Sequence, residues 1–384
     1  MSVRKQPVLG ILGGGQLARM LALAAAPLGV NTLVVDSAAD ACAGQVAPLR
    51  LADWTDYAAL EKFAAEVDVV TFDFENVPAE TAHWLAERVA VFPDPRALAV
   101  AQDRLAEKTL FRQCGLQTPA FEAVDTRADL DRALAAIGAP AILKTRRLGY
   151  DGKGQFRIKQ LADADAAWAA LGAQAAAHGL ILEAFVPFER ELSVLAVRTR
   201  EGDFRIWPLT QNWHTDGVLS LSLAPAPEVG ALQQRAEDLA RTLAERLGYV
   251  GVFALELFVK DGQLLGNEMA PRVHNSGHWT IEGAVASQFE NHVRAVLGLP
   301  LGDTSAHGLS VMFNWIGDLP DAAPVLSTVD AHWHDYGKQP RPGRKVGHAT
   351  VCAADAQSLA LRVAAMAQAL KRETQAEPGL SALS

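Results

Sequence analysis

The start of the chain carries the pattern that most restricts the fold. Residues 8–12 form a short, entirely apolar run, and Gly13, Gly14 and Gly15 follow it directly. Over residues 16–28 apolar side chains recur on one helical face, and residues 31–36 form a second strand-like run. A strand, a glycine turn, a helix and another strand in this order predict a parallel sheet covered on both faces. We therefore expect an α/β unit that ends near residue 100.

The glycine turn also matches a known phosphate-binding pattern. Gly13-x-Gly15-x-x-Ala18 follows a strand, and Asp36 ends the next strand, as in the dinucleotide-binding fingerprint. The physical basis is general, because glycines let backbone N–H groups approach an anion and a helix N-terminus favours negative charge. This segment alone therefore fits NAD or FAD, another phosphate ligand, or a plain tight turn.

Beyond a loop at residues 115–119 the pattern changes to mixed α+β. Strand-like runs separated by turns and helices lie at residues 141–147, 155–159, 180–186, 191–197, 252–259 and 263–269. We expect helices at 95–114 and 231–247, strands near 310–316 and 348–352, a helix at 356–371 and a frayed final dozen residues. The expected units are a Rossmann-like domain at 1–104, an α+β domain at 105–300 and a small domain at 301–384.

Composition excludes several classes of protein. The 384 residues are 50% hydrophobic and 21% charged, which favours packed cores over disorder. The net charge of −9 opposes nucleic-acid binding, so any local cluster of cations needs its own explanation. Cys42, Cys114 and Cys352 are scattered, which predicts reduced thiols. Glycines and Arg19 interrupt the first apolar stretch, so we expect no membrane contact and a cytoplasmic protein.

A second glycine-rich loop argues against a dinucleotide. Lys144 lies on an apolar strand, and the run Gly-Tyr-Asp-Gly-Lys-Gly at 149–154 connects it to a return strand. The backbone amides of such a flap can lie on phosphate oxygens while the lysine supplies fixed charge, although the Walker A spacing is absent. A loose β-hairpin is the alternative interpretation.

Two carboxylates, Glu256 and Glu268, flank the turn Asp261-Gly262 on successive strands. A three-residue loop centred on Gly262 would place them opposite each other, whereas the two-residue turn that Asp-Gly favours would offset them. Opposed carboxylates repel unless a cation lies between them, and with nucleotide phosphates they are ligands that Mg²⁺ prefers. Asn275 could add an oxygen. Two solvated carboxylates are the alternative, which their apolar neighbours disfavour.

Two further polar clusters are candidate site residues. The first, directly after the strand of Glu268, is Arg272, His274 and Asn275. The second is the loop that contains Lys338, Arg341, Arg344 and Lys345, interrupted by proline and glycine. In a chain of net charge −9, such a loop indicates an anionic substrate rather than a merely solvated segment.

These residues together resemble the ATP-grasp enzymes and, more narrowly, the 5-(carboxyamino)imidazole ribonucleotide synthases of purine biosynthesis. The matching motifs, in the same order over nearly the whole chain, are Gly-Gly-Gly-Gln-Leu at 13–17, Phe74-Glu75, Gln102-Asp103-Arg104 with Lys108, and residues 149–154, 267–278 and 341–348. The last two are specific to the narrower family. The resemblance implies an ATP-grasp fold with a Rossmann-like (pre-ATP-grasp) N-terminal domain and a small C-terminal domain.

The resemblance also implies the roles of the site residues. ATP would contact Arg104, Lys144, Gly149, Tyr150, Asp151, Gly152, Gly154, Gln155, Glu183, Ala184, Phe185, Val186, Glu191, His214 and Asn267, and Mg²⁺ would bind Glu256 and Glu268. The ribonucleotide would contact Gly15, Gln16, Leu17, Glu75, Tyr150, Lys338, Arg344 and Lys345. The implied catalytic residues are Lys153, Arg272, His274 and Asn275. Lys153 stands where the family often has Arg, so a point charge would replace a bidentate phosphate contact.

The implied reaction is ATP-dependent carboxylation. Bicarbonate would be phosphorylated to carboxyphosphate, and 5-aminoimidazole ribonucleotide would take the carboxyl group, giving 5-(carboxyamino)imidazole ribonucleotide, ADP and phosphate. An ATP-grasp ligase that uses formate or an amino acid is the nearest alternative. A dinucleotide-binding oxidoreductase leaves the flap and the carboxylate pair unexplained, and a non-catalytic nucleotide-binding regulator would release no ADP. We expect a homodimer whose other partners are small molecules.

Overall fold

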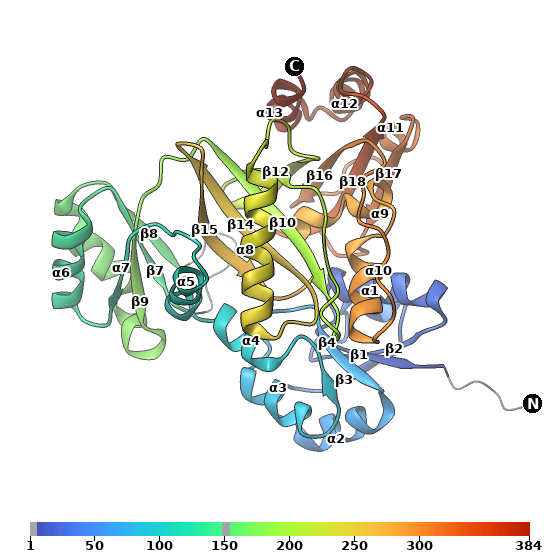
Figure 1. The fold of residues 1–384 in the computed structure, drawn as a ribbon, viewed down its shortest axis with the longest axis horizontal. Coiled ribbons are helices and arrows are strands. Elements are labelled where there is room, and N and C mark those ends of the chain that lie inside the picture. Colours follow the sequence, from blue (N-terminus) through green and yellow to red (C-terminus); the bar gives the residue numbers. More distant parts are fainter. Residues whose placement is uncertain (1–5, 148–153) are drawn as a thin grey trace, which may run out of the picture.

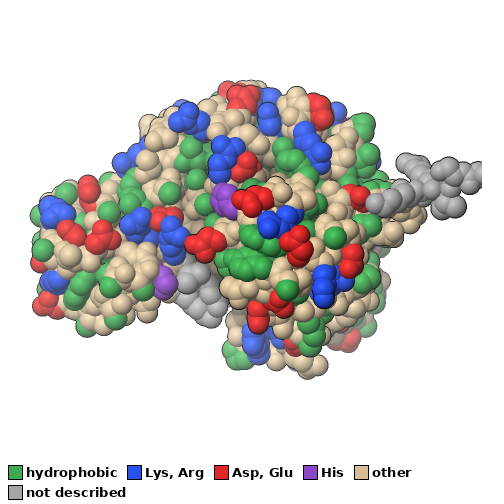
Figure 2. Space-filling model, turned by 90° about the horizontal axis from the view of Figure 1, so that it is seen from below, with side chains coloured by type: hydrophobic (Ala, Val, Ile, Leu, Met, Phe, Trp, Pro, Cys, Tyr) green, Lys and Arg blue, Asp and Glu red, His purple; other side chains and the backbone are tan. Residues whose placement is uncertain are grey.

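The computed structural model describes residues 6–147 and 154–384, which form three sheets of five, four and nine strands. In Figure 1 the N-terminal sheet (blue to cyan) lies at the bottom and the four-stranded lobe (teal to green) at the left. The largest sheet runs from the centre into the C-terminal part (orange to red). On the face in Figure 2, acidic and basic side chains are interspersed. Every helix of the described residues is too short or too polar to cross a membrane.

The first sheet is parallel, with the strand order β3-β2-β1-β4-β5. Its strands are β1 (Val8–Leu12), β2 (Asn31–Asp36), β3 (Leu49–Leu51), β4 (Val69–Phe72) and β5 (Ala90–Val91). The accompanying helices are α1 (Gln16–Ala25), α2 (Tyr57–Glu66) and α3 (Ala79–Ala86), with short 3₁₀ turns at Ala26–Leu28 and Cys42–Gln45. Strand β1 is buried at four of its five positions, as a sheet covered on both faces requires. The predicted α/β unit is confirmed.

The second sheet is antiparallel and forms a small lobe with the order β6-β9-β7-β8. Its strands are β6 (Phe121–Val124), β7 (Ala141–Thr145), β8 (Gln155–Ile158) and β9 (Leu180–Ala184). Helices α6 (Arg127–Ile137) and α7 (Ala164–His178), with a 3₁₀ turn at Leu161–Asp163, pack on it through a shared apolar core. The predicted contacts of Gly149, Tyr150, Asp151, Gly152 and Lys153 fall between β7 and β8, outside the described residues.

The third sheet is antiparallel and has the order β15-β14-β10-β12-β13-β16-β18-β17, with β11 beside β10. Its strands are β10 (Arg190–Arg198), β11 (Phe204–Ile206), β12 (Thr210–Thr215), β13 (Val218–Ala224), β14 (Gly251–Lys260), β15 (Gln263–Ala270), β16 (Leu309–Ile316), β17 (Ala331–Asp335) and β18 (Lys345–Ala353). Its helices are α8 (Leu232–Leu247), α9 (Thr280–Gly283), α10 (Gln288–Val296), α11 (Ala323–Leu326), α12 (Ala356–Leu370) and α13 (Glu373–Leu383), with a 3₁₀ turn, η4, at Asn275–Gly277. Strand β13 pairs with β16, so the third sheet continues across the domain boundary predicted at residue 300. The domain boundaries stay a prediction.

Two predictions of helices are wrong. Residues 95–114 form two helices, α4 (Pro95–Ala101) and α5 (Arg104–Gln113), because Asp103 adopts extended backbone and its side chain caps the second helix. The final dozen residues are not frayed, since all of them except Ser384 belong to α13, in which Ala376 is fully buried. Gly379 lets this helix approach Leu221 of β13 so closely that a Cβ would lie 2.8 Å from a leucine methyl carbon.

His292 on α10 connects the first sheet to the third. Its Nε2 lies 2.7 Å from the Thr71 hydroxyl on β4, and its Nδ1 accepts a hydrogen bond from the Val252 N–H on β14 at 3.0 Å. An acceptor at Nδ1 puts the proton of the neutral ring on Nε2. Burial lowers the pKa of His292 to about 3, so the ring remains neutral inside the folded protein.

We expect this histidine to make the folded protein less stable in acid. Below pH ~6.5 the unfolded chain binds a proton at His292 that the folded protein does not bind until about pH 3, so stability falls as the pH decreases between these values. The contribution to the slope reaches about 1.4 kcal/mol per pH unit. Urea unfolding at several pH values between about 6.5 and 5 should show this slope in the wild type and a smaller one in His292→Gln. Equal slopes would contradict the lowered pKa.

Candidate active site

Two cavities meet at a small group of charged and polar residues. The larger has a volume of about 1370 Å³ and the smaller about 370 Å³. The residues that line both are Glu75, Arg272, His274, Asn275 and Lys345. They come from the end of the first sheet, the segment after β15 and the start of β18. The fold thus brings together candidate residues that are far apart in the sequence.

The glycine turn and the basic loop line the larger cavity. Gly15, Gln16, Leu17, Lys338, Arg341, Arg344 and Lys345 all border it. Lys338 Nζ donates to Gln16 Oε1, across 322 positions of sequence. The cavity also has lining residues that sequence reasoning did not single out: Thr215, Asp216, Lys371, Arg372, Thr374 and Gln375. The last two belong to α13, where the composition predicts fraying rather than a wall.

Two carboxylates accept hydrogen bonds from backbone N–H groups in and just after the glycine turn. Asp36 Oδ2 accepts the Gly14 N–H at 2.6 Å, and Asp73 Oδ2 accepts the Ala18 N–H at 3.2 Å. Gly13 has a φ of +97°, and a Cβ there would overlap Asp73 Oδ1. Burial raises the pKa of Asp73 to about 7. Because side chains already bind these amides, a dinucleotide pyrophosphate would have to displace them, which disfavours the oxidoreductase interpretation.

Asp73 is a candidate site residue that sequence reasoning missed. It directly follows β4 in the first sheet and lines the larger cavity. Ligands in parallel sheets bind at the carboxyl ends of strands, and the position of Asp73 one residue after a buried apolar run was the available signal.

A buried ion-pair network fixes Lys144 beside the smaller cavity. Lys144 Nζ lies 2.9 Å from Glu183 Oε2, and the fully buried Lys108 Nζ lies 3.4 Å from the same oxygen. Burial alone would raise the pKa of Glu183, but the two ammonium groups lower it to about 2. The ionised carboxylate therefore holds Lys144 in place.

Of the eleven described residues assigned to ATP, six border the smaller cavity and five do not. Arg104, Lys144, Gln155, Glu191, His214 and Asn267 line it. Gly154, Glu183, Ala184, Phe185 and Val186, which are also described, line neither cavity. Glu183 acts here as the counter-ion of two lysines, a role that its strand position did not indicate.

Glu256 and Glu268 stand directly opposite each other on β14 and β15. The turn between the strands has two residues, Asp261 and Gly262, both with positive φ. If the strands kept the pairing register that this turn sets, the two glutamates would be offset by one residue. A β-bulge leaves Asn267 without a partner across the strands and shifts Glu268 into line with Glu256. The carboxylates are therefore opposed despite the two-residue turn.

The two carboxylates differ in their electrostatic surroundings. Arg104 Nη1 lies 3.1 Å from Glu268 Oε2, and although burial alone would raise the pKa of Glu268, this guanidinium lowers it. Burial and the charge of Glu268 raise the pKa of Glu256. The two carboxylates repel each other, and a divalent cation between them would relieve that repulsion.

The donor set fits a magnesium–nucleotide complex. Both amide atoms of Asn275 are buried, have no hydrogen-bond partner among the described residues and belong to a side chain that lines both cavities. The described residues contain no cluster of three or more His, Cys, Asp or Glu side chains that could hold a metal ion by themselves. Mg²⁺ usually binds to one or two carboxylates and takes its other ligands from water and phosphates. The pair Glu256 and Glu268 meets that requirement.

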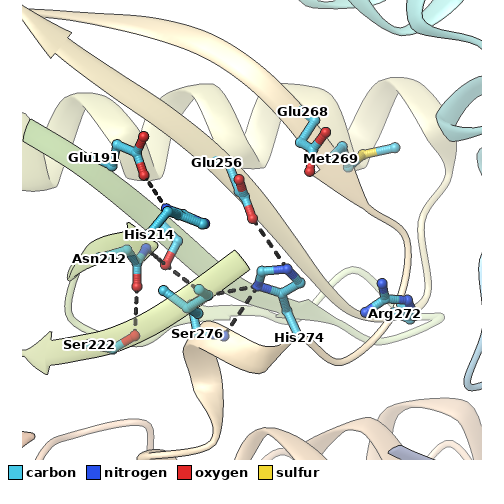
Figure 3. Close-up of polar contacts among 12 residues, drawn as sticks. Glu191, Asn212, His214, Ser222, Glu256, Glu268, Met269, Arg272, His274 and Ser276 are labelled. Atoms are coloured by element: carbon cyan, nitrogen blue, oxygen red, sulfur yellow. Dashed lines mark hydrogen bonds and ion pairs between the residues drawn. The ribbon is translucent and has the colours of Figure 1, made fainter. Parts of the chain in front are cut away.

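Charged pairs surround the point where the cavities meet. Arg272 binds Glu75 through its Nε, and although burial alone would raise the pKa of Glu75, this guanidinium lowers it to about 2. His214 binds Glu191 through Nδ1, and although burial alone would lower the pKa of His214, this hydrogen bond and the charges of the surrounding carboxylates together raise it. Figure 3 shows the His274 ring between Ser276 and Glu256, with Glu268 on the next strand. The site therefore presents fixed charges of both signs around one space.

Three family models match successive parts of the chain. They describe a ribonucleotide synthetase preATP-grasp domain at residues 7–102, an ATP-grasp domain at 109–289 and a phosphoribosylaminoimidazole carboxylase C-terminal domain at 310–362. The first match covers the first sheet, the second covers the small lobe and strands β10–β15 of the third sheet, and the third covers strands β16–β18 of that same sheet.

Similar proteins cover nearly the whole chain. The N5-carboxyaminoimidazole ribonucleotide synthase of Pseudomonas aeruginosa is 52% identical over 356 residues, which are 93% of this chain and 97% of the relative. The N5-carboxyaminoimidazole ribonucleotide synthetase of Thermus thermophilus has a TM-score of 0.90 and 52% identity over 94% of this chain and 98% of that one. The Aspergillus clavatus synthase in complex with ADP and 5-aminoimidazole ribonucleotide has a TM-score of 0.86 and 31% identity over 96% and 99%. The chain belongs to the N5-carboxyaminoimidazole ribonucleotide synthase family of ATP-grasp enzymes.

Proposed function

We propose that the protein catalyses the ATP-dependent carboxylation of 5-aminoimidazole ribonucleotide by bicarbonate in purine biosynthesis. The products are N5-carboxyaminoimidazole ribonucleotide, ADP and phosphate. The observation that carries this proposal is the meeting of two cavities of different character at Glu75, Arg272, His274, Asn275 and Lys345. One cavity suits a magnesium-bound nucleotide and the other an anionic ribonucleotide. The carboxyl group that ATP activates must reach the amine of the ribonucleotide, so the two sites must adjoin.

We assign ATP to the smaller cavity. Lys144 and Arg104 supply fixed positive charge for phosphate oxygens, and Glu256 and Glu268 supply the protein ligands of Mg²⁺. Bound Mg²⁺ neutralises charge on the phosphates during phosphoryl transfer. Glu183 contributes indirectly, because it holds the Lys144 ammonium in place before the nucleotide binds.

We assign the ribonucleotide to the larger cavity, with its 5′-phosphate between the glycine turn and the basic loop. Gly15, Gln16 and Leu17 border this space on one side, and Lys338, Arg344 and Lys345 border it on the other. Charge-assisted hydrogen bonds from lysine and arginine are the contacts that a phosphate dianion selects. The Tyr150 contact that the family resemblance implies lies outside the described residues.

The residues shared by both cavities would face the reacting groups. Bicarbonate becomes a useful carboxyl donor only after phosphorylation supplies a leaving group. The amine nitrogen of the ribonucleotide then bonds to the carboxyl carbon, the bond from that carbon to the phosphate oxygen breaks, phosphate leaves and the amine loses a proton. Arg272, held by Glu75, supplies a permanent positive charge for the anions, and the unpartnered Asn275 amide is available to a ligand.

ADP release tests this proposal directly. With ATP and Mg²⁺ present, we expect rapid ADP formation only when bicarbonate and 5-aminoimidazole ribonucleotide are supplied together, and slow release with either one alone. Equal ADP release with glycinamide ribonucleotide and formate would contradict the assignment and favour another ATP-grasp ligase. The homodimer stays a prediction that sedimentation equilibrium can test.

A further inference from the structure

A line of buried polar side chains crosses the largest sheet behind His274. It begins at Ser222 on β13, passes through Asn212 on β12 and Ser193 on β10, and ends at Ser276 in the 3₁₀ turn η4. The exposed fractions of these four residues are 0%, 6%, 0% and 0%. Polar groups in a core lower stability unless they are paired, so a continuous line of them calls for a specific role.

The hydrogen bonds along this line all point toward the histidine. Ser222 Oγ donates to Asn212 Oδ1 at 2.7 Å, and Asn212 Nδ2 donates to Ser193 Oγ at 3.0 Å. Ser193 Oγ in turn donates to Ser276 Oγ at 2.8 Å. Because Ser276 Oγ already accepts a hydrogen bond from Ser193, its own hydroxyl proton is available to His274 Nδ1, which lies 2.9 Å away.

The backbone N–H of Ser276 shows that His274 Nδ1 is not protonated. Its N–H donates to His274 Nδ1 at 3.3 Å, and a backbone amide can only donate. Nδ1 therefore carries a lone pair, and the proton of the neutral ring lies on Nε2. His274 Nε2 lies 3.3 Å from Glu256 Oε1, one of the two carboxylates assigned to Mg²⁺ (Figure 3).

We propose that Ser276, backed by Ser193, Asn212 and Ser222, is a positioning residue that holds His274 in the tautomer with its proton on Nε2. The inference rests on the proposed function, because His274 lines both of the cavities that are assigned to the substrates. With this tautomer the ring presents a donor to Glu256 Oε1, and the carboxylate so oriented would be available to hold a cation. The opposite tautomer would present a lone pair to a carboxylate oxygen, and the carboxylate would lose the contact that orients it.

The primary test reads the tautomer directly. In the full-length wild-type protein labelled with ¹⁵N-histidine, the His274 resonances, assigned by their absence in His274→Gln, should show a bare Nδ1 and a protonated Nε2. A proton on Nδ1 would overturn the proposal. The measurement uses no substrate, so failure of this inference and failure of the proposed carboxylation are separate results.

Alanine substitutions along the line supply the second test. Ser276→Ala should populate the other tautomer measurably and lower kcat about fivefold to tenfold, with the KM for ATP changed less than about twofold, since one hydrogen bond of ordinary strength is lost. The loss of kcat should be smaller in Ser193→Ala than in Ser276→Ala, and smaller still in Ser222→Ala. Ser276→Thr, which keeps the hydroxyl, should restore the wild-type tautomer.

The matched control is Ser310→Ala on β16. Ser310 is 1% exposed and its Oγ contacts Cys352 Sγ at 3.4 Å, outside the line to His274. This variant undergoes the same chemical change at the same burial and should keep the wild-type kcat. A wild-type tautomer in Ser276→Ala, together with equal losses of kcat in all four variants, would mean that the line serves core packing alone and would overturn the proposal. If Ser276→Ala does not fold, the wild-type spectrum still decides.

Discussion

Glu268→Gln should lower turnover about a thousandfold, because it removes a carboxylate charge that we propose binds the Mg²⁺ of the nucleotide at the smaller cavity. The amide keeps the shape of the side chain, but it cannot replace an ionised metal ligand, and it leaves Arg104 without this carboxylate partner. Steady-state ADP release at saturating substrates measures the effect. The circular dichroism spectrum and thermal midpoint should stay close to those of the wild type, since Glu268 faces a cavity rather than the core.

The matched control for this variant is Glu122→Gln on β6, an exposed strand glutamate in the small lobe. It undergoes the same chemical change away from both cavities and should retain wild-type turnover. If Glu268→Gln kept turnover within about threefold of the wild type at ordinary Mg²⁺ concentrations, the opposed carboxylates would be structural only.

Arg344→Ala and Lys144→Met should have opposite effects on the two substrates. Arg344 lines only the larger cavity and Lys144 only the smaller one. Removing one charge-assisted donor costs about 1.5–3 kcal/mol of binding free energy, which corresponds to roughly tenfold to a hundredfold in affinity. Arg344→Ala should therefore weaken ribonucleotide binding by that factor and leave ATP within about threefold, while Lys144→Met should do the reverse.

Equilibrium titration of each ligand alone measures these effects without relying on turnover. Lys159→Met, at an exposed position just after β8, supplies the control for loss of a lysine charge. If Arg344→Ala weakened ATP binding and left ribonucleotide binding intact, the basic loop would belong to the nucleotide site, and the division of substrates between the two cavities would be wrong.

The sequence predicts the parts of this fold whose signals are local. The apolar run before Gly13 and the helix after it specify the first parallel strands, because neither depends on distant residues. The split of the helix predicted at 95–114 also had a local signal, the capping residue Asp103, which apolar periodicity on both sides obscured. Helix α13 had none, because its burial depends on a close fit between Gly379 and Leu221.

The candidate site depends more on geometry that spacing does not reveal. Opposition of Glu256 and Glu268 requires the bulge at Asn267, which a simple alternating strand pattern does not include. The pair between Arg272 and Glu75 joins residues 197 positions apart, and only the packing of the first sheet against the third brings them together. The residue types indicated the chemistry of the site, whereas the arrangement of two adjoining cavities could be recognised only in the folded structure.

The most direct test of the account follows the oxygen atoms of bicarbonate. The wild-type enzyme would be supplied with ATP, Mg²⁺, 5-aminoimidazole ribonucleotide and bicarbonate labelled with ¹⁸O, and the phosphate would be isolated for mass spectrometry. If bicarbonate attacks the γ-phosphate and the carboxyl group then moves to the amine, each phosphate carries one oxygen from bicarbonate and the new carboxylate carries the other two. Unlabelled phosphate, formed in step with the carboxylated ribonucleotide, would show that ATP is consumed without phosphorylating bicarbonate and would contradict the proposed reaction.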